Sequence, residues 1–164
     1  MITIYKNGEL HFQNKIYKCT LGKNGIKKKK QEGDGCTPEG IYSLGPLYYR
    51  SDRIKKLKTY FKPIPIEKDM FWSDDPQSEH YNKLIRFKDS SFESLYKENH
   101  TYDIILVINY NISPTIKGKG SAIFLHLAKK DFSATSGCIA LKKECLFEIL
   151  DKLDIDNKIR IVSN

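Results

Sequence analysis

The chain has 164 residues, a formal net charge of +8, 40% hydrophobic residues and 29% charged residues, which suits one globular domain with a single core. No apolar run approaches the roughly 20 residues that span a bilayer, so no transmembrane segment is expected. The 10 Tyr, 8 Phe and 1 Trp argue against a disordered chain, because disordered segments carry few aromatic residues.

Short strands separated by turns are predicted for the first part of the chain. Residues 2–5 and 10–12 flank Asn7-Gly8, and Asn-Gly is the dipeptide that most strongly favours a hairpin turn. A third strand is predicted over residues 15–21. A glycine-rich loop then leads into a further strand over residues 41–44.

A run of four lysines, residues 27–30, carries much of the positive charge of this region. Residues 1–35 contain eight Lys against three acidic residues. A charged run in a loop is usually a solvated surface, and on that reading no nucleic acid is expected as a partner. The alternative is a non-catalytic module whose lysines bind an anionic glycan or nucleic acid.

The four cysteines do not form a metal or disulfide pattern. There is no C-x-x-C pair and no His at zinc-finger spacing, so neither a metal site nor a cofactor is expected. Cys19, in a predicted strand, and Cys145, on an apolar helix face, are expected to be core thiols. Cys36 lies in the glycine-rich loop, where a redox lock with Cys138 is a minor alternative.

The middle and later parts of the chain differ in regularity. Residues 46–100 contain many aromatic residues and several turn-forming prolines, which predicts an elaborated insertion. Residues 104–108 form a continuous apolar run, typical of a central strand that is buried on both faces. A strand over residues 121–127 places Phe124 and His126 on one face.

The end of the chain completes the predicted fold. Apolar residues at helical spacing predict an amphipathic helix over residues 142–153, and residues 158–162 form a closing strand. The predicted fold is therefore mostly β (β-rich α+β). It is one domain over residues 1–164, a curved sheet or sandwich with a C-terminal amphipathic helix lying against it.

Cys138 follows a glycine in a Thr-Ser-Gly-Cys turn before an apolar segment. Gly137 permits a backbone that turns the thiol and the neighbouring N–H groups toward a pocket. A thiol needs a base to become a thiolate at neutral pH, and His126, twelve residues upstream, is the candidate. From spacing alone, a packed Cys and a hydrogen-bonded core His are the commoner outcome.

Two segments carry a resemblance to a known family. Residues 120–126 (Gly-Ser-Ala-Ile-Phe-Leu-His) and 135–141 (Thr-Ser-Gly-Cys-Ile-Ala-Leu) resemble the catalytic region of the YkuD-type L,D-transpeptidases, cysteine enzymes that cross-link peptidoglycan stem peptides. Residues 37–40 (Thr-Pro-Glu-Gly) look like that family's Thr-Pro-x-Gly start of a strand. Residues 72–76, followed by Tyr81-Asn82, resemble a compact proteobacterial branch of the family.

The resemblance implies roles for individual residues. Cys138 is the implied nucleophile, His126 its base, and the N–H groups of Gly137 and Cys138 the oxyanion donors. Ser136 belongs to the same catalytic turn, and Ser121, Ser136 or a backbone carbonyl could orient His126. The candidates for substrate binding are Tyr81, Asn82, Trp72, Thr135 and Arg86.

The sequence also departs from the family's commonest pattern. Ser136 stands where that pattern has a second His, and the gap between His126 and Thr135 is shorter than usual. Ala140 stands where the pattern has Asn or Arg, so a contact to a substrate carboxylate is expected from elsewhere, with Arg50, Arg53 or Arg86 as candidates. The departures indicate a subgroup with altered donor specificity.

The implied function is a monomeric peptidoglycan L,D-transpeptidase that works through a thioester acyl-enzyme on stem peptides, without a cofactor. The compact branch favours 1,3-type cross-links. A covalent adduct of the cysteine with a carbapenem is also implied. Two alternatives stay open: an L,D-carboxypeptidase or amidase that acts on muropeptides with the same residues, and the non-catalytic binding module.

The localisation is left open by the sequence. The first residues lack the basic start, apolar segment and cleavage site of a secretory signal, and the unpaired cysteines suit a reducing interior. On these features the chain as written looks cytosolic. The substrate that the resemblance implies lies instead in the periplasm or cell wall.

Overall fold

A tight turn at Asn7-Gly8 begins the fold, in a computed structural model that describes residues 1–28 and 31–164. Gly8 has a φ of +80°, the left-handed conformation that glycine adopts without strain. The predicted hairpin is confirmed, and it continues into a third antiparallel strand. These strands are β1 (Ile2–Tyr5), β2 (Glu9–Phe12) and β3 (Lys15–Thr20).

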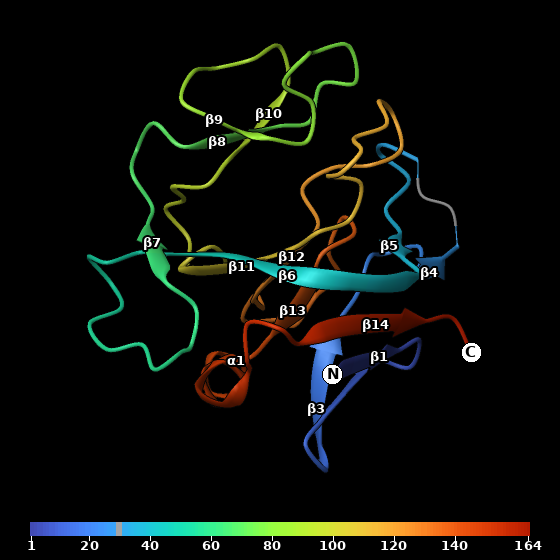
Figure 1. Ribbon diagram of the computed structural model, residues 1–164, viewed down its shortest axis with the longest axis vertical. Helices are drawn as coiled ribbons and strands as arrows, with labels where there is room; N and C mark the ends of the chain where they lie inside the picture. The colour runs from blue at the N-terminus through green and yellow to red at the C-terminus, as the bar shows by residue number, and fades with distance from the viewer. Residues whose placement is uncertain (29–30) are drawn as a thin grey trace.

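The main sheet closes on itself through one long strand, β6 (Figure 1). The first half of β6 pairs with β14, and its second half pairs with β11. Because β11 continues through β12 and β13 to β3, the predicted curved sheet wraps around a central core. The bounds are β6 (Gly40–Tyr49), β7 (Pro63–Pro65), β11 (Ile104–Ile108), β12 (Phe124–Leu127), β13 (Ile139–Leu141) and β14 (Lys158–Val162).

Strand β11 is buried on both faces, as its apolar run predicts. Ile104, Leu106 and Ile108 face the main core, which the closed sheet and the helix share. Ile105 and Val107 face a second apolar cluster, to which the insertion contributes Ile66, Met70, Trp72 and Leu95. The insertion therefore covers the outer face of the central strands.

The insertion is built around a small three-stranded sheet, which lies at the top of Figure 1. Its strands are β8 (Phe71–Ser73), β9 (Leu84–Ile85) and β10 (Phe92–Ser94). A two-stranded parallel pair, β4 (Ile26–Lys27) and β5 (Thr37–Pro38), flanks the glycine-rich loop. Of the lysine run, Lys27 and Lys28 are exposed, whereas Lys29 and Lys30 lie outside the described residues.

The C-terminal helix is confirmed as α1 (Lys143–Lys152), one residue shorter at each end than predicted. Leu146, Ile149 and Leu150 form its buried face, at the spacing of an amphipathic helix. Where the structure describes the chain, no helix is both long and apolar enough to span a bilayer.

Strand β12 begins at Phe124, three residues later than predicted. Ala122 has a φ of +51°, which a strand does not accommodate. Its backbone N–H bonds to the side chain of Asn82 instead of to a neighbouring strand. A tertiary contact therefore overrides the local strand propensity.

Truncating Leu150 tests how far the fold depends on the packing of α1. Leu150 is fully buried, so Leu150→Ala is expected to lower the free energy of unfolding by about 2–5 kcal/mol through lost burial and a residual cavity. Urea unfolding measures the difference, with the exposed neighbour changed in Asp151→Ala as the control. Equal midpoints for the two variants would contradict the assigned packing.

Candidate active site

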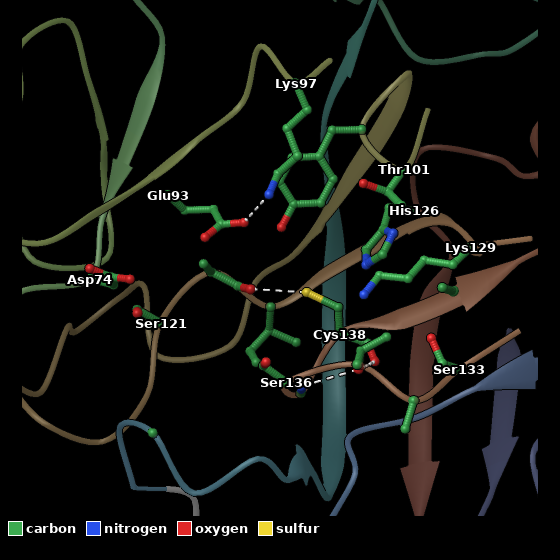
Figure 2. Close-up of a pocket in the computed structure, with 18 of the residues that line it drawn as sticks. Asp74, Glu93, Lys97, Thr101, Ser121, His126, Lys129, Ser133, Ser136 and Cys138 are labelled. Atoms are coloured by element: carbon green, nitrogen blue, oxygen red, sulfur yellow. Dashed lines mark hydrogen bonds and ion pairs between the residues drawn. The ribbon is translucent and has the colours of Figure 1, made fainter. Parts of the chain in front are cut away.

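A cavity of about 430 Å³ lies beside the ends of β12 and β13 (Figure 2). The insertion and the loop between β12 and β13 line it together with the glycine-rich loop. Its volume falls in the range of small-molecule sites. The polar and charged lining residues are Glu32, Asp74, Glu93, Lys97, Thr101, Tyr102, Ser121, His126, Lys129, Ser133, Thr135, Ser136 and Cys138.

The pairing of β12 with β13 brings His126 and Cys138 to the same face of the sheet. The two strands are parallel, with His126 opposite Ala140 and Leu125 opposite Ile139. Since side chains alternate along a strand, Cys138 shares a face with Ala140 and therefore with His126. Figure 2 shows the imidazole and the thiol directed into the same part of the cavity.

A backbone carbonyl orients His126. Its Nδ1 lies 2.9 Å from the carbonyl oxygen of Leu127, and because a carbonyl only accepts, we assign the proton to Nδ1. This tautomer leaves Nε2 as a hydrogen-bond acceptor. Ser121, one of the two side-chain alternatives, donates to Glu32 at 3.0 Å instead.

Burial keeps His126 neutral. The residue is 7% exposed, and its ring packs edge-on against Tyr102 with the centroids 5.1 Å apart. Desolvation lowers the pKa of His126 from 6.5 to about 4, because burial disfavours the charged imidazolium. At neutral pH the ring is therefore uncharged.

The thiol of Cys138 contacts two backbone groups of the segment that precedes and begins β12. Its Sγ donates to the carbonyl oxygen of Ala122 at 3.2 Å and lies 3.3 Å from the N–H of Phe124. An N–H group directed at the sulfur favours the thiolate form. The residue is 8% exposed, so the sulfur lies near the floor of the cavity.

Two threonine hydroxyls shape the turn that carries Cys138. Thr135 Oγ1 accepts the N–H of Gly137 at 3.1 Å and donates to the carbonyl of Cys138 at 2.6 Å. Thr37 Oγ1 donates to the carbonyl of Gly137 at 3.0 Å. The Gly137 N–H, an expected oxyanion donor, is thus engaged within the turn. Thr135 lines the cavity, but its hydroxyl is engaged in hydrogen bonds to the backbone of the turn. Ser136 also lines the cavity and is exposed.

The side-chain amide of Asn82 holds the segment that contacts the thiol. Its Oδ1 accepts from Trp72 Nε1 at 2.9 Å and from the Ala122 N–H at 3.0 Å. Its Nδ2 donates to the carbonyls of Tyr110 and Asn111, at 3.1 and 2.7 Å. With both atoms engaged and only 2% of the residue exposed, Asn82 supports the backbone behind the thiol.

The predicted amphipathic wall of Tyr81, Asn82 and Trp72 therefore lies behind the cavity and does not line it. Tyr81 is 1% exposed, and its hydroxyl donates to Glu32 at 2.6 Å and accepts the N–H of Gly120 at 2.9 Å. These side chains lie outside the cavity because their polar atoms form hydrogen bonds that connect loops.

The three candidate arginines also lie away from the cavity lining, each next to a carboxylate. Arg86 bonds to Glu67 and Asp69, and Arg53 bonds to Asp103 at 2.8 Å. Arg50 forms a two-pronged pair with Asp52, donates to the carbonyl of Lys97 and stacks on Tyr96. Arg50 and Arg53 thus hold the end of the insertion against the main sheet.

The insertion supplies cavity residues that the sequence reasoning did not single out. Lys97 pairs with Glu93 at 2.8 Å and lies over the ring of Tyr102, 4.6 Å from its centroid. The pKa of Tyr102 is raised well above its usual value, chiefly because burial disfavours the charged phenolate, and the neighbouring Cys138 and Glu93 raise it further. No spacing pattern marks these residues, because they come from an irregular segment.

None of the four cysteines forms a disulfide. Cys36 is fully buried and does not line the cavity; its Sγ donates to the carbonyls of Asn24 and Asp34. The structure thus shows no redox lock between Cys36 and Cys138. Cys19 is a core thiol, as expected, and burial raises its pKa to about 12. Cys145 is partly buried against the core.

Over residues 1–28 and 31–164, no three His, Cys, Asp or Glu side chains gather as a metal site.

Comparisons with known proteins identify a family and related folds. The profile described as the L,D-transpeptidase catalytic domain, YkuD, matches residues 1–161. The solved structure of Bdellovibrio bacteriovorus Bd1075 is similar in fold, with 15% identity and a TM-score of 0.50, over 100% of this chain and 48% of that one. The helical cell shape determining protein Pgp2 from Campylobacter jejuni aligns with 20% identity and a TM-score of 0.45, over 99% and 46%. This chain thus spans about half the length of either protein. No curated protein sequence matches it.

Exchanging Asn82 for Asp tests the role of its amide. The carboxylate would face the carbonyls of Tyr110 and Asn111 without the two donors, so Asn82→Asp is expected to cost about 3–5 kcal/mol of unfolding free energy, as for other uncompensated buried charges. The matched control is Asn14→Asp, because Asn14 shares the positive φ but is exposed. Urea unfolding compares the two, and equal losses would contradict the assigned role.

The lowered pKa of His126 predicts an acid-dependent loss of stability. Between pH 6.5 and about 4, the unfolded chain binds a proton at this residue more readily than the folded one. The stabilisation is therefore complete above pH 6.5 and falls by about 3 kcal/mol as the pH drops to 4. Urea unfolding across this range should show a weaker dependence of stability on pH for His126→Gln. The control His80→Gln, at a partly buried position outside the cavity, should keep the wild-type dependence.

Proposed function

The chain belongs to the YkuD family of L,D-transpeptidase catalytic domains, and we propose that it is a cysteine acyltransferase acting on peptidoglycan stem peptides. The observation that carries the proposal is the placement of a thiol and a neutral imidazole on one face of β12 and β13, inside a cavity. A nucleophile next to a base that is itself oriented by a third group is the arrangement that covalent acyl transfer requires.

In the first half of the proposed reaction, Nε2 of His126 takes the proton of the Cys138 thiol. The thiolate attacks the carbonyl carbon of a donor stem, which gives a tetrahedral oxyanion. The backbone N–H of Cys138 is the proposed oxyanion donor, and one such donor is worth roughly 3 kcal/mol in a comparable site. His126 then returns the proton to the leaving amine as the C–N bond breaks, and a thioester remains on Cys138.

In the second half, an amine of an acceptor stem attacks the thioester. His126 removes a proton from that amine, the new amide bond forms, and the thiol is regenerated. Water in place of the amine would release the trimmed donor, which is the L,D-carboxypeptidase reaction. The nature of the acceptor, and not a different set of residues, therefore separates the two activities.

For the cross-link, we favour the 1,3 type, in which the donor acyl group is the L-Ala at position one of the stem. This assignment rests on the resemblance of residues 72–76 and Tyr81-Asn82 to the compact branch of the family. Supplying donor stems of different length, and reading the mass of the cross-linked product, distinguishes 1,3-type from 3,3-type links.

Intact-mass spectrometry after incubation with a carbapenem tests the proposed nucleophile. One covalent adduct is expected for the wild type, none for Cys138→Ala, and an unchanged adduct for Cys145→Ala, whose thiol is partly buried outside the cavity. His126→Gln should slow acylation by about 100-fold, the usual contribution of a general base. Absence of an adduct, together with a Cys138 inert to alkylation, would reject the catalytic proposal.

A further inference from the structure

Two lysines line the cavity, and they differ in how their charge is compensated. Lys97 is paired with Glu93 at 2.8 Å and lies over the ring of Tyr102. Lys129 lies in the loop after β12, and it makes no ion pair with any residue that the structure describes. In Figure 2 its side chain extends toward the side of the cavity where His126 and Cys138 are drawn.

The backbone at Lys129 is held in place on both sides. The N–H of Ala128 bonds to the carbonyl of Leu141 at 2.7 Å, and the N–H of Phe132 bonds to the carbonyl of Lys129 at 3.0 Å. Further along the loop, the N–H of Thr135 bonds to the carbonyl of Leu21. The exposed side chain of Lys129 therefore extends from a backbone whose position is fixed.

We propose that Lys129 binds the carboxylate of the residue whose amine is expelled, and so determines which donors are accepted. The inference rests on the proposed function. In an α-amino acid the amine and the carboxylate are attached to the same carbon, so a leaving amine at His126 places the carboxylate near the same end of the cavity. A lysine ammonium there gains a charge-assisted hydrogen bond to that carboxylate.

The other charges of the cavity support this orientation. Asp74 and Ser121 lie on the opposite side of Cys138 from Lys129 in Figure 2, and Ser121 bonds to Glu32, a second acidic lining residue. A carboxylate would be repelled from that side. The arginines expected to bind it are engaged with carboxylates of their own. Among the cavity-lining residues that the structure describes, Lys129 is thus the cation without an ion-pair partner.

A pair of small alkylating agents tests the position of this charge without any peptidoglycan substrate. Iodoacetate carries a carboxylate, and iodoacetamide is its neutral counterpart. A cation near Cys138 should therefore raise the rate of alkylation by iodoacetate relative to the rate by iodoacetamide. Lys129→Ala is expected to lower this ratio about fivefold, the effect of one unit charge a few ångströms away in water. Lys129→Arg should restore it, and the exposed neighbour variant Lys130→Ala should leave it at the wild-type value.

Turnover of matched donors tests the specificity itself. A stem peptide whose leaving residue has a free carboxylate should exceed its amidated form by about 10-fold or more in kcat/KM, chiefly through KM. Lys129→Ala should remove this preference and Lys130→Ala should keep it. An unchanged preference or an unchanged alkylation ratio in Lys129→Ala would overturn the inference. A wild type that processes neither donor would instead contradict the proposed function, and the alkylation ratio would still decide the position of the charge.

Discussion

The parallel pairing of β12 with β13 is the constraint on which the site depends. It joins two short strands whose side chains point alternately into the main core and toward the insertion. Leu125 and Ile139 anchor this register in the core, and the same register places His126 and Cys138 together on the other face. A slip by one residue would reverse both faces at once, so the packing of the core also secures the geometry of the thiol and the imidazole.

Buried polar side chains hold the backbone around this pair. Asn82 fixes the segment at Ala122, Thr37 and Thr135 fix the turn at Gly137, and Tyr81 ties the glycine-rich loop to Gly120. Ala122 has a positive φ, a conformation that costs a non-glycine residue free energy. The hydrogen bond from the Ala122 N–H to Asn82 offsets that cost. In this conformation the carbonyl of Ala122 points at the sulfur of Cys138.

The closed sheet and the insertion make different contributions to the cavity. The sheet provides Cys138 and His126, the proposed nucleophile and base, and the apolar packing beneath them. The insertion provides charged groups such as Asp74, Glu93 and Lys97, together with the second apolar cluster that covers β11. Arg50 and Arg53 bond to carboxylate and carbonyl partners at the end of the insertion, which holds these charged groups against the sheet.

Local elements could be predicted from the sequence: the Asn7-Gly8 hairpin, the strand over residues 104–108, the amphipathic helix and the family to which the Cys138 turn belongs. These follow from turn chemistry, periodicity and a contiguous motif, which a sequence displays directly. The folded structure was needed to show that the sheet closes through β6 and that a backbone carbonyl orients His126. It was also needed to show that Asn82 lies behind the cavity, whereas Lys129 lines it. The bond of His126 to its neighbour Leu127 is local, but it forms only in the rotamer that the packed cavity permits. The contacts of Asn82 join residues far apart in the chain, and no local pattern records which partner a polar side chain will find once the core has packed.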